Sequence, residues 1–185
     1  LRGRMLPSEK DSARMSHAST PPPPSPPGSP GSPTQMETAH GYSPPTVTQF
    51  SVFLTNKVGK LHDLVEVFDR SHCHISALSV HEASDHAVVR LITSNAQLGR
   101  TTLQQEKLAF TERDVLVVAL AGNHTLSSMC LSLLRAELSI HFAYPLMATP
   151  GDAATIALAV DDLTLAGQIL RRKEFRLLGE ADLGC

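Results

Sequence analysis

The feature that most constrains the fold is an internal repeat that begins after about residue 46. Apolar residues of one helical stripe recur 65 positions later, as does an isoleucine of the strand pattern that follows. The matching pairs are Leu61 and Leu126, Leu64 and Met129, Phe68 and Leu133, and Ile75 and Ile140. Further on the separation becomes about 67, which aligns Val89 with Ile156 and Leu91 with Leu158. A repeat of this kind predicts two copies of one structural unit.

The first copy alternates between strand and helix patterns. Residues 48–55 alternate with a period of two, which predicts a strand, and residues 60–71 carry an apolar stripe at helical spacing. Two strands, a second helix capped by Ser94 or Asn95, and a final strand are predicted next, at 75–82, 87–93, 95–107 and 110–114. The order βαββαβ is that of a ferredoxin-like unit.

The same pattern starts again at Val115. Strands are predicted at 115–120, 140–147, 153–160 and 175–178, with a turn at 150–152 and helices at 126–134 and after Asp161 or Asp162. The predicted fold is therefore α+β, with two tandem ferredoxin-like βαββαβ units and antiparallel sheets. Each sheet has one helix-free face that needs cover, which a second unit or a dimer would supply.

The domain limits follow from composition as well as from the repeat. Residues 1–45 hold nearly all of the prolines, with Ser, Gly and Thr between them, so this tail is predicted to be disordered or polyproline-like. Residues 46–114 and 115–185 are the two predicted domains. Because the chain begins at Leu1, Met15 and Met36 are alternative starts, and the tail's presence in the cell stays open.

Charge and composition exclude several classes of partner. The formal net charge is −2 and there is no basic run, so nucleic acid is not an expected partner. There is no apolar run of about 20 residues and no signal-peptide pattern, so neither a membrane partner nor export is expected. Three cysteines at no useful spacing are typical of a reducing compartment, which predicts a cytoplasmic protein.

The residues also offer little for bond-breaking chemistry. His72, Cys73 and His74 adjoin one another but have no metal-ligand spacing, and Cys130 lies within an apolar helical stripe. Ser127 and Ser128 lack a glycine elbow. We therefore predict no catalytic residues, no metal and no cofactor, and expect that the protein is not an enzyme.

At this point the sequence resembles the ACT-domain family, and most closely its tandem, non-catalytic members. The resemblance rests on residues 49–54 (Gln-Phe-Ser-Val-Phe-Leu), 56–61 (Asn-Lys-Val-Gly-Lys-Leu), 75–80 and 89–92 together with Ser84-Asp85, and it extends over about 48–180. It implies ferredoxin-like folds, pairing of modules into a continuous sheet, and an amino-acid site at a module interface near the loop after the first strand.

The resemblance places the ligand at that loop and the neighbouring strand. The candidate ligand-binding residues are Asn56, Lys57, Val58, Gly59, Lys60, Leu61, Leu78 and Ser79. A helix N-terminus offers N–H groups to a carboxylate, and a glycine there removes the Cβ that would block close approach. The Asn56 amide can bind the ligand's ammonium or carboxylate group. The alternative interpretation of Gly59 is an ordinary strand-to-helix turn.

Two departures from the family pattern bear on the site. Val58 stands where the family commonly has proline, which removes some rigidity from the loop. In the second unit Ala121 and His124 occupy the positions of Asn56 and Gly59, so a site is expected only in the first unit.

The predicted function is regulatory binding of an amino acid by a homodimer. The ligand is expected to bridge two units and to shift a pairing or partner equilibrium, in which the partner is a regulated enzyme or regulator. Two alternatives stay open, namely an interaction module that binds no ligand and, with less support, an enzyme on a ferredoxin-like fold. The sequence does not indicate which amino acid binds.

Overall fold

The computed structural model describes residues 41–83, 85–147 and 153–183, and these form an α+β fold, as predicted. Residues 1–40 of the tail predicted over residues 1–45 lie outside the described residues, as does the turn predicted at 150–152. All of the strand pairs are antiparallel, which confirms the prediction from the repeat.

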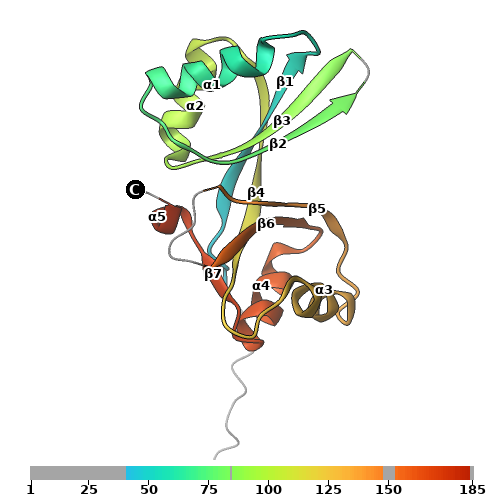
Figure 1. Ribbon diagram of the computed structural model, residues 1–185. Coiled ribbons are helices and arrows are strands. Elements are labelled where there is room, and N and C mark those ends of the chain that lie inside the picture. The colour runs from blue at the N-terminus through green and yellow to red at the C-terminus, as the bar shows by residue number, and fades with distance from the viewer. Residues whose placement is uncertain (1–40, 84, 148–152, 184–185) are drawn as a thin grey trace, which may run out of the picture. The chain divides into compact units, whose positions relative to one another are not determined.

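The chain passes twice through the same series of elements (Figure 1). The first half consists of β1 (Val47–Thr55), α1 (Lys60–Arg70), β2 (Ile75–Ala83), β3 (His86–Thr93), α2 (Ala96–Gln105) and the start of β4 (Ala109–Leu120). The second half continues through α3 (Leu126–Leu134), β5 (Ile140–Pro145), β6 (Ala154–Val160), α4 (Leu163–Arg172), β7 (Arg176–Leu178) and α5 (Glu180–Leu183). The βαββαβ order is thus confirmed for both halves.

β4 belongs to both halves, which the sequence did not indicate. Strands at 110–114 and 115–120 were predicted separately, but the structure has one unbroken strand of 12 residues. Its first part pairs with β1 as far as Val115, and its second part pairs with β6 from Leu116 and with β7. No glycine, proline or asparagine interrupts the segment, so nothing local ends the strand where its partners change.

The strands of both units form one sheet, in agreement with the continuous sheet that the resemblance implied. It has seven strands in the order β2-β3-β1-β4-β6-β5, with β7 also paired to β4. Read from either end toward β4, each half has the strand order of a ferredoxin-like unit.

Helices cover one face of each half of the sheet. In the first half α1 and α2 bury a core that includes Phe50, Phe68 and Leu103. In the second half α3 and α4 bury a core that includes Met129 and Leu170. The pattern of apolar residues on each helix decides this, since the buried positions recur at helical spacing.

The helix-free faces are covered where the two halves meet. A third core joins first-half residues such as Val47 and Ile92 to second-half residues such as Val117, Tyr144 and Leu178. Burial of this shared core supplies part of the cover that was expected, while Phe53, farther along the same face of β1, is 43% exposed.

Polar contacts also cross between the halves. The Tyr144 hydroxyl donates to Gln49 Oε1 at 2.8 Å, and the Met147 N–H donates to the Ser76 carbonyl at 2.8 Å. The guanidinium carbon of Arg90 lies 4.2 Å from the centre of the Phe142 ring. Burial raises the pKa of Tyr144, so this hydroxyl stays protonated and available as a donor.

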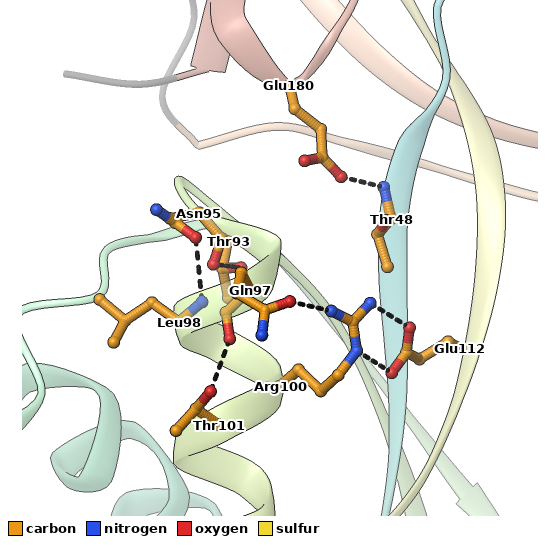
Figure 2. A network of polar contacts seen from close by, with 9 residues as sticks. All are labelled: Thr48, Thr93, Asn95, Gln97, Leu98, Arg100, Thr101, Glu112 and Glu180. Carbon is orange, nitrogen blue, oxygen red and sulfur yellow. Dashed lines mark hydrogen bonds and ion pairs between the residues drawn. The ribbon is translucent and has the colours of Figure 1, made fainter.

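A second group of polar contacts joins α2 to β4 and, nearby, β1 to α5 (Figure 2). Arg100 on α2 donates two hydrogen bonds to the Glu112 carboxylate on β4, at 2.7 and 2.6 Å. Nearby, the Thr48 N–H at the start of β1 donates to Glu180 on α5, at 3.1 Å. Glu180 thus ties the end of the chain to the first strand.

The segment before β1 packs against the second half. Pro44 is buried, and a Cβ added to Gly167 on α4 would lie 2.5 Å from the Pro44 Cβ. A Cβ on Gly179 would lie 3.4 Å from Pro45. Pro44 and Pro45 were assigned to the tail from their composition, whereas the structure buries Pro44 beside α4 and places the exposed Pro45 near Gly179.

Candidate ligand-binding site

The loop between β1 and α1 leaves the first turn of α1 open. Gly59, the residue before the helix, has a left-handed backbone with φ 88°, and no side-chain hydrogen bond caps the helix. By contrast Asn95, Thr125 and Asp162 cap α2, α3 and α4 with side-chain oxygens. The Lys60 N–H donates to the Lys57 carbonyl at 3.2 Å, so the other N–H groups of the first turn are the ones that could bind a carboxylate.

The candidate residues of this loop all lie at the surface. Residues 56–61 are exposed, and nothing lies within 4 Å of a Cβ added to Gly59. The Lys60 ammonium binds the Asp63 carboxylate at 2.8 Å, and this hydrogen bond lowers the pKa of Asp63. A ligand carboxylate at the helix end would compete with Asp63 for Lys60.

Asn56 holds the loop against the β2–β3 hairpin. Its backbone N–H donates to the Asp85 carbonyl at 2.9 Å, and its side-chain Nδ2 donates to Glu82 Oε1 at 2.7 Å. The side chain that the sequence assigned to the ligand therefore makes a structural contact as well. Sequence reasoning missed Glu82 and Asp85, although the adjacency of β1 and β3 in a ferredoxin-like unit places this hairpin beside the loop.

Leu78 and Ser79 are not brought to the loop within one chain. Through their β3 partners, Leu78 and Ser79 are in register with residues 50 and 51 of β1. The loop begins after Thr55, so the two residues lie roughly 13 Å from it along the strand direction. The two side chains also point to opposite faces, since Leu78 packs on the core under α1 and α2.

A small hollow lies beside the first turns of α1. It has a volume of about 120 Å³, and Lys60 is the candidate residue that lines it, together with Asp63 and Glu106 and with Leu54, Leu64, Val67 and Leu108. One ammonium and two carboxylates above an apolar floor suit a small zwitterion better than a purely apolar ligand.

The corresponding loop of the second half is closed. Gly122 there has φ 63°, and Thr125 and Ser128 form a reciprocal capping box at the start of α3. The Thr125 oxygen accepts from the Ser128 N–H, and the Ser128 hydroxyl accepts from the Thr125 N–H. The His124 ring lies 4.3 Å from that of Phe175. The first turn of α3 thus meets part of its hydrogen-bonding needs from its own side chains.

Other kinds of site find little support in the described part of the chain. No three His, Cys, Asp or Glu side chains gather there as potential metal ligands. Cys73 and Cys130 are free thiols, and burial raises the pKa of Cys73. None of the described helices is both long and apolar enough to cross a membrane.

These features define a protein of two ferredoxin-like units on a shared strand, with one open helix end. The family model for the ACT domain pair matches residues 45–184, and the chain belongs to that family. The resemblance seen in the sequence is thereby confirmed, and no catalytic domain is detected in the chain. No curated protein matches it.

A solved structure with a TM-score above 0.5 supports the fold. Protein BT0572 from Bacteroides thetaiotaomicron is 24% identical, with a TM-score of 0.67 over 75% of this chain and 95% of that one. The ligand-free regulatory subunit of aspartate kinase from Thermus thermophilus is 7% identical, with a TM-score of 0.49 over 70% and 93% of the two chains. The likeness to BT0572 concerns the fold alone, and the second likeness is too distant to carry an argument.

Proposed function

We propose that this protein is a regulatory module that binds a free amino acid at the N-terminus of α1. The observation that carries the proposal is the open end of α1 behind Gly59 in a chain of the ACT pair family. Three other helices of this chain cap their first turns with side chains, whereas α1 leaves that place to a ligand.

The ligand's groups match the groups around the loop. Its carboxylate would accept from the N–H groups of the first turn of α1, where the helix dipole favours negative charge. Its ammonium would lie toward Asp63 or Glu106, and the size of its side chain is limited by the hollow of about 120 Å³. Asn56 and Lys57 would border the site, and Val58 would close over it from the exposed side of the loop.

The proposed action is regulation without catalysis. We place the two ACT units at residues 46–114 and 115–185, and a homodimer is the proposed assembly, in which Leu78 and Ser79 of one chain approach the loop of the other. Ligand binding would shift the population of a form that contacts a regulated enzyme or regulator. The free thiols of Cys73 and Cys130 suit the reducing cytoplasm.

Calorimetric titration with each of the twenty amino acids tests the proposal. We expect one of them, or a small group, to bind wild type, and Gly59→Trp to abolish binding because the indole would cover the open helix end. Gly122→Trp is the matched control, since Gly122 also has a positive φ and open space around it, but in the second loop. That variant should bind normally.

Circular dichroism would show that both variants are folded. Binding that survives Gly59→Trp would move the site away from the first loop. An absence of binding to wild type at millimolar concentration would leave the alternative of an interaction module without a ligand, which the closed second loop already favours for that half.

A further inference from the structure

The helix-free face of the first half changes from apolar to cationic along its strands. Side chains two residues apart on a strand share a face of the sheet. Ile92 of β3 and Val115 of β4 belong to the shared core, so Arg90 and Arg113, two residues before them, lie on the same face. A sheet face next to a buried core is normally apolar, and two cations there need an explanation.

The equivalent position in the second half is apolar and buried. At the repeat spacing of about 67 residues, Arg90 corresponds to Ala157. Ser51 lies opposite Arg90 across β1 and β3, and Val117 lies opposite Ala157 across β4 and β6. Both Val117 and Ala157 are fully buried. The architecture of the unit therefore does not itself require an arginine at this place.

Neither guanidinium has a counter-charge in the described part of the chain. Arg90 and Arg113 make no hydrogen bond or ion pair there, and Nη1 of Arg90 is buried. The acidic residues of the four first-half strands are Glu82, Glu112 and Asp114, which strand alternation places on the opposite face. The helix-free face thus carries two unpaired positive charges.

Hydroxyl groups and an aromatic ring surround Arg90. Ser51 and Ser79 are its cross-strand neighbours on β1 and β2. The Phe142 ring covers it from β5, with the ring centre 4.2 Å from the guanidinium carbon of Arg90 and 5.9 Å from that of Arg113. Because the ring excludes water from part of the Arg90 guanidinium, the attraction of an anion to its open edge is stronger than in bulk water.

We propose that this face binds a phosphoryl group, which Arg90 and Arg113 hold together with the hydroxyls of Ser51 and Ser79. A phosphomonoester carries a charge of about −1.5 to −2 at pH 7 and three terminal acceptor oxygens. That charge and those oxygens match two guanidiniums and two hydroxyls better than a carboxylate does, which has one charge and two oxygens. The site is separate from the proposed amino-acid site at α1.

The groove beside Arg113 limits the rest of the ligand. It has a volume of about 510 Å³ and is also lined by His141, Asp161 and Asp162. The two aspartates make no ion pair with Arg113 in the described structure. Their carboxylates would repel a second anionic group, so the ligand should carry a single phosphoryl group on a neutral or cationic body.

Isothermal titration of the full chain, in a phosphate-free buffer of constant ionic strength, tests the proposal with inorganic phosphate and with glycerol 3-phosphate. Wild type should bind at least one of them with a dissociation constant of roughly 0.1–5 mM. Arg90→Met and Arg113→Met should each weaken this binding about tenfold or more. Arg135→Met is the matched control, since it removes one exposed arginine outside the site, and it should bind like wild type.

The two compounds also distinguish the sources of the phosphoryl group. Tighter binding of glycerol 3-phosphate identifies an esterified ligand, and equal or tighter binding of inorganic phosphate identifies the free ion. Because Arg113 is exposed, Arg113→Met tests the site even if circular dichroism shows that Arg90→Met does not fold.

The open end of α1 could attract an anion as well, and Gly59→Trp separates the two places. Phosphate binding should persist in this variant, whereas its loss would move the anion to α1 and overturn the proposal. An absence of binding of both compounds to wild type at about 20 mM would overturn it too. So would acetate that binds as tightly as phosphate, or phosphate binding that Arg135→Met weakens as much as Arg113→Met does.

Discussion

At the scale of single residues, Gly59 and Gly99 are constrained in different ways. Gly59 has φ 88° in open space, whereas a Cβ on Gly99 would lie 2.8 Å from Thr93 Oγ1 and 3.2 Å from the Phe50 ring. The first glycine is needed for its backbone conformation and the second for close packing of α2 on the sheet.

The constraint at Gly59 predicts the effect of small substitutions there. Gly59→Ala should lower the free energy of unfolding by about 1 kcal/mol, because an L-residue pays that cost in the left-handed region. Gly59→Asn should cost less, since asparagine adopts this conformation more readily. Urea denaturation followed by circular dichroism measures both, and equal stability of all three proteins would show that the loop relaxes.

The stacking of Arg90 on Phe142 predicts a coupling between the halves. Arg90 Nη1 is buried without a hydrogen-bond partner in the described structure. The cation–π contact with the Phe142 ring is therefore the interaction that offsets the burial of this guanidinium. Phe142→Leu should destabilise wild type by about 1 kcal/mol more than it destabilises the Arg90→Met variant.

A double-mutant cycle in urea measures this difference. Arg113, whose guanidinium lies 5.9 Å from the same ring, provides the control, because the Arg113→Met background should leave most of the Phe142→Leu effect in place. A coupling of the same size with Arg113 would mean that the field of both cations, rather than the Arg90 stack, acts on the ring.

At the scale of elements, the Arg100–Glu112 pair joins α2 to β4 and makes stability depend on pH (Figure 2). Its hydrogen bonds lower the pKa of Glu112 below the ordinary value of 4.5, so the folded state favours the charged carboxylate. The stability gained is present above the unfolded-state pKa and is lost as pH falls through the folded-state pKa. Arg100→Met should therefore lower the melting temperature by roughly 1–3 °C at pH 7 and by less at pH 3.

Scanning calorimetry at pH 7, 5 and 3 measures that difference. In a Glu112→Gln background, Arg100→Met should have little effect at any of these pH values. A wild-type advantage that is constant with pH would mean that Arg100 acts through packing of its aliphatic stem rather than through the carboxylate.

Most elements were predictable from the sequence because their signals are local. Periods of 3.6 and 2 residues, together with caps such as Asn95 and Asp162, mark helices and strands within a few residues of the chain. The continuity of β4 was not predictable, because its two parts differ in their partners and not in any local signal. The positions of Leu78 and Ser79 relative to the loop depend on register, which long-range pairing decides. The loop itself was predictable, since Gly59 has a distinctive backbone requirement.

At the scale of the whole molecule, the two halves share a strand and a core. β4 pairs with β1 at one end and with β6 at the other, and the shared core joins residues such as Val47 to residues such as Tyr144. Unfolding of either half would remove the pairing partners of one end of β4 and would expose the shared core to water. The repeat in the sequence thus marks two structural units, but their shared strand and core predict that both unfold together.

We therefore expect residues 41–183 to unfold in one cooperative transition. The chain has no tryptophan, so Phe53→Trp in the first half and Leu165→Trp in the second give one fluorescence reporter for each, both at partly exposed sites. The urea midpoints of the two reporters should coincide, because a shared core couples both halves.

Val117→Ala, which removes buried volume from the shared core, should lower both midpoints by the same amount. Gly99→Ala, a change within the first half alone, should also shift the second-half reporter. Midpoints that separate in either variant would show that β4 can fray between its two sets of partners and that each half folds on its own.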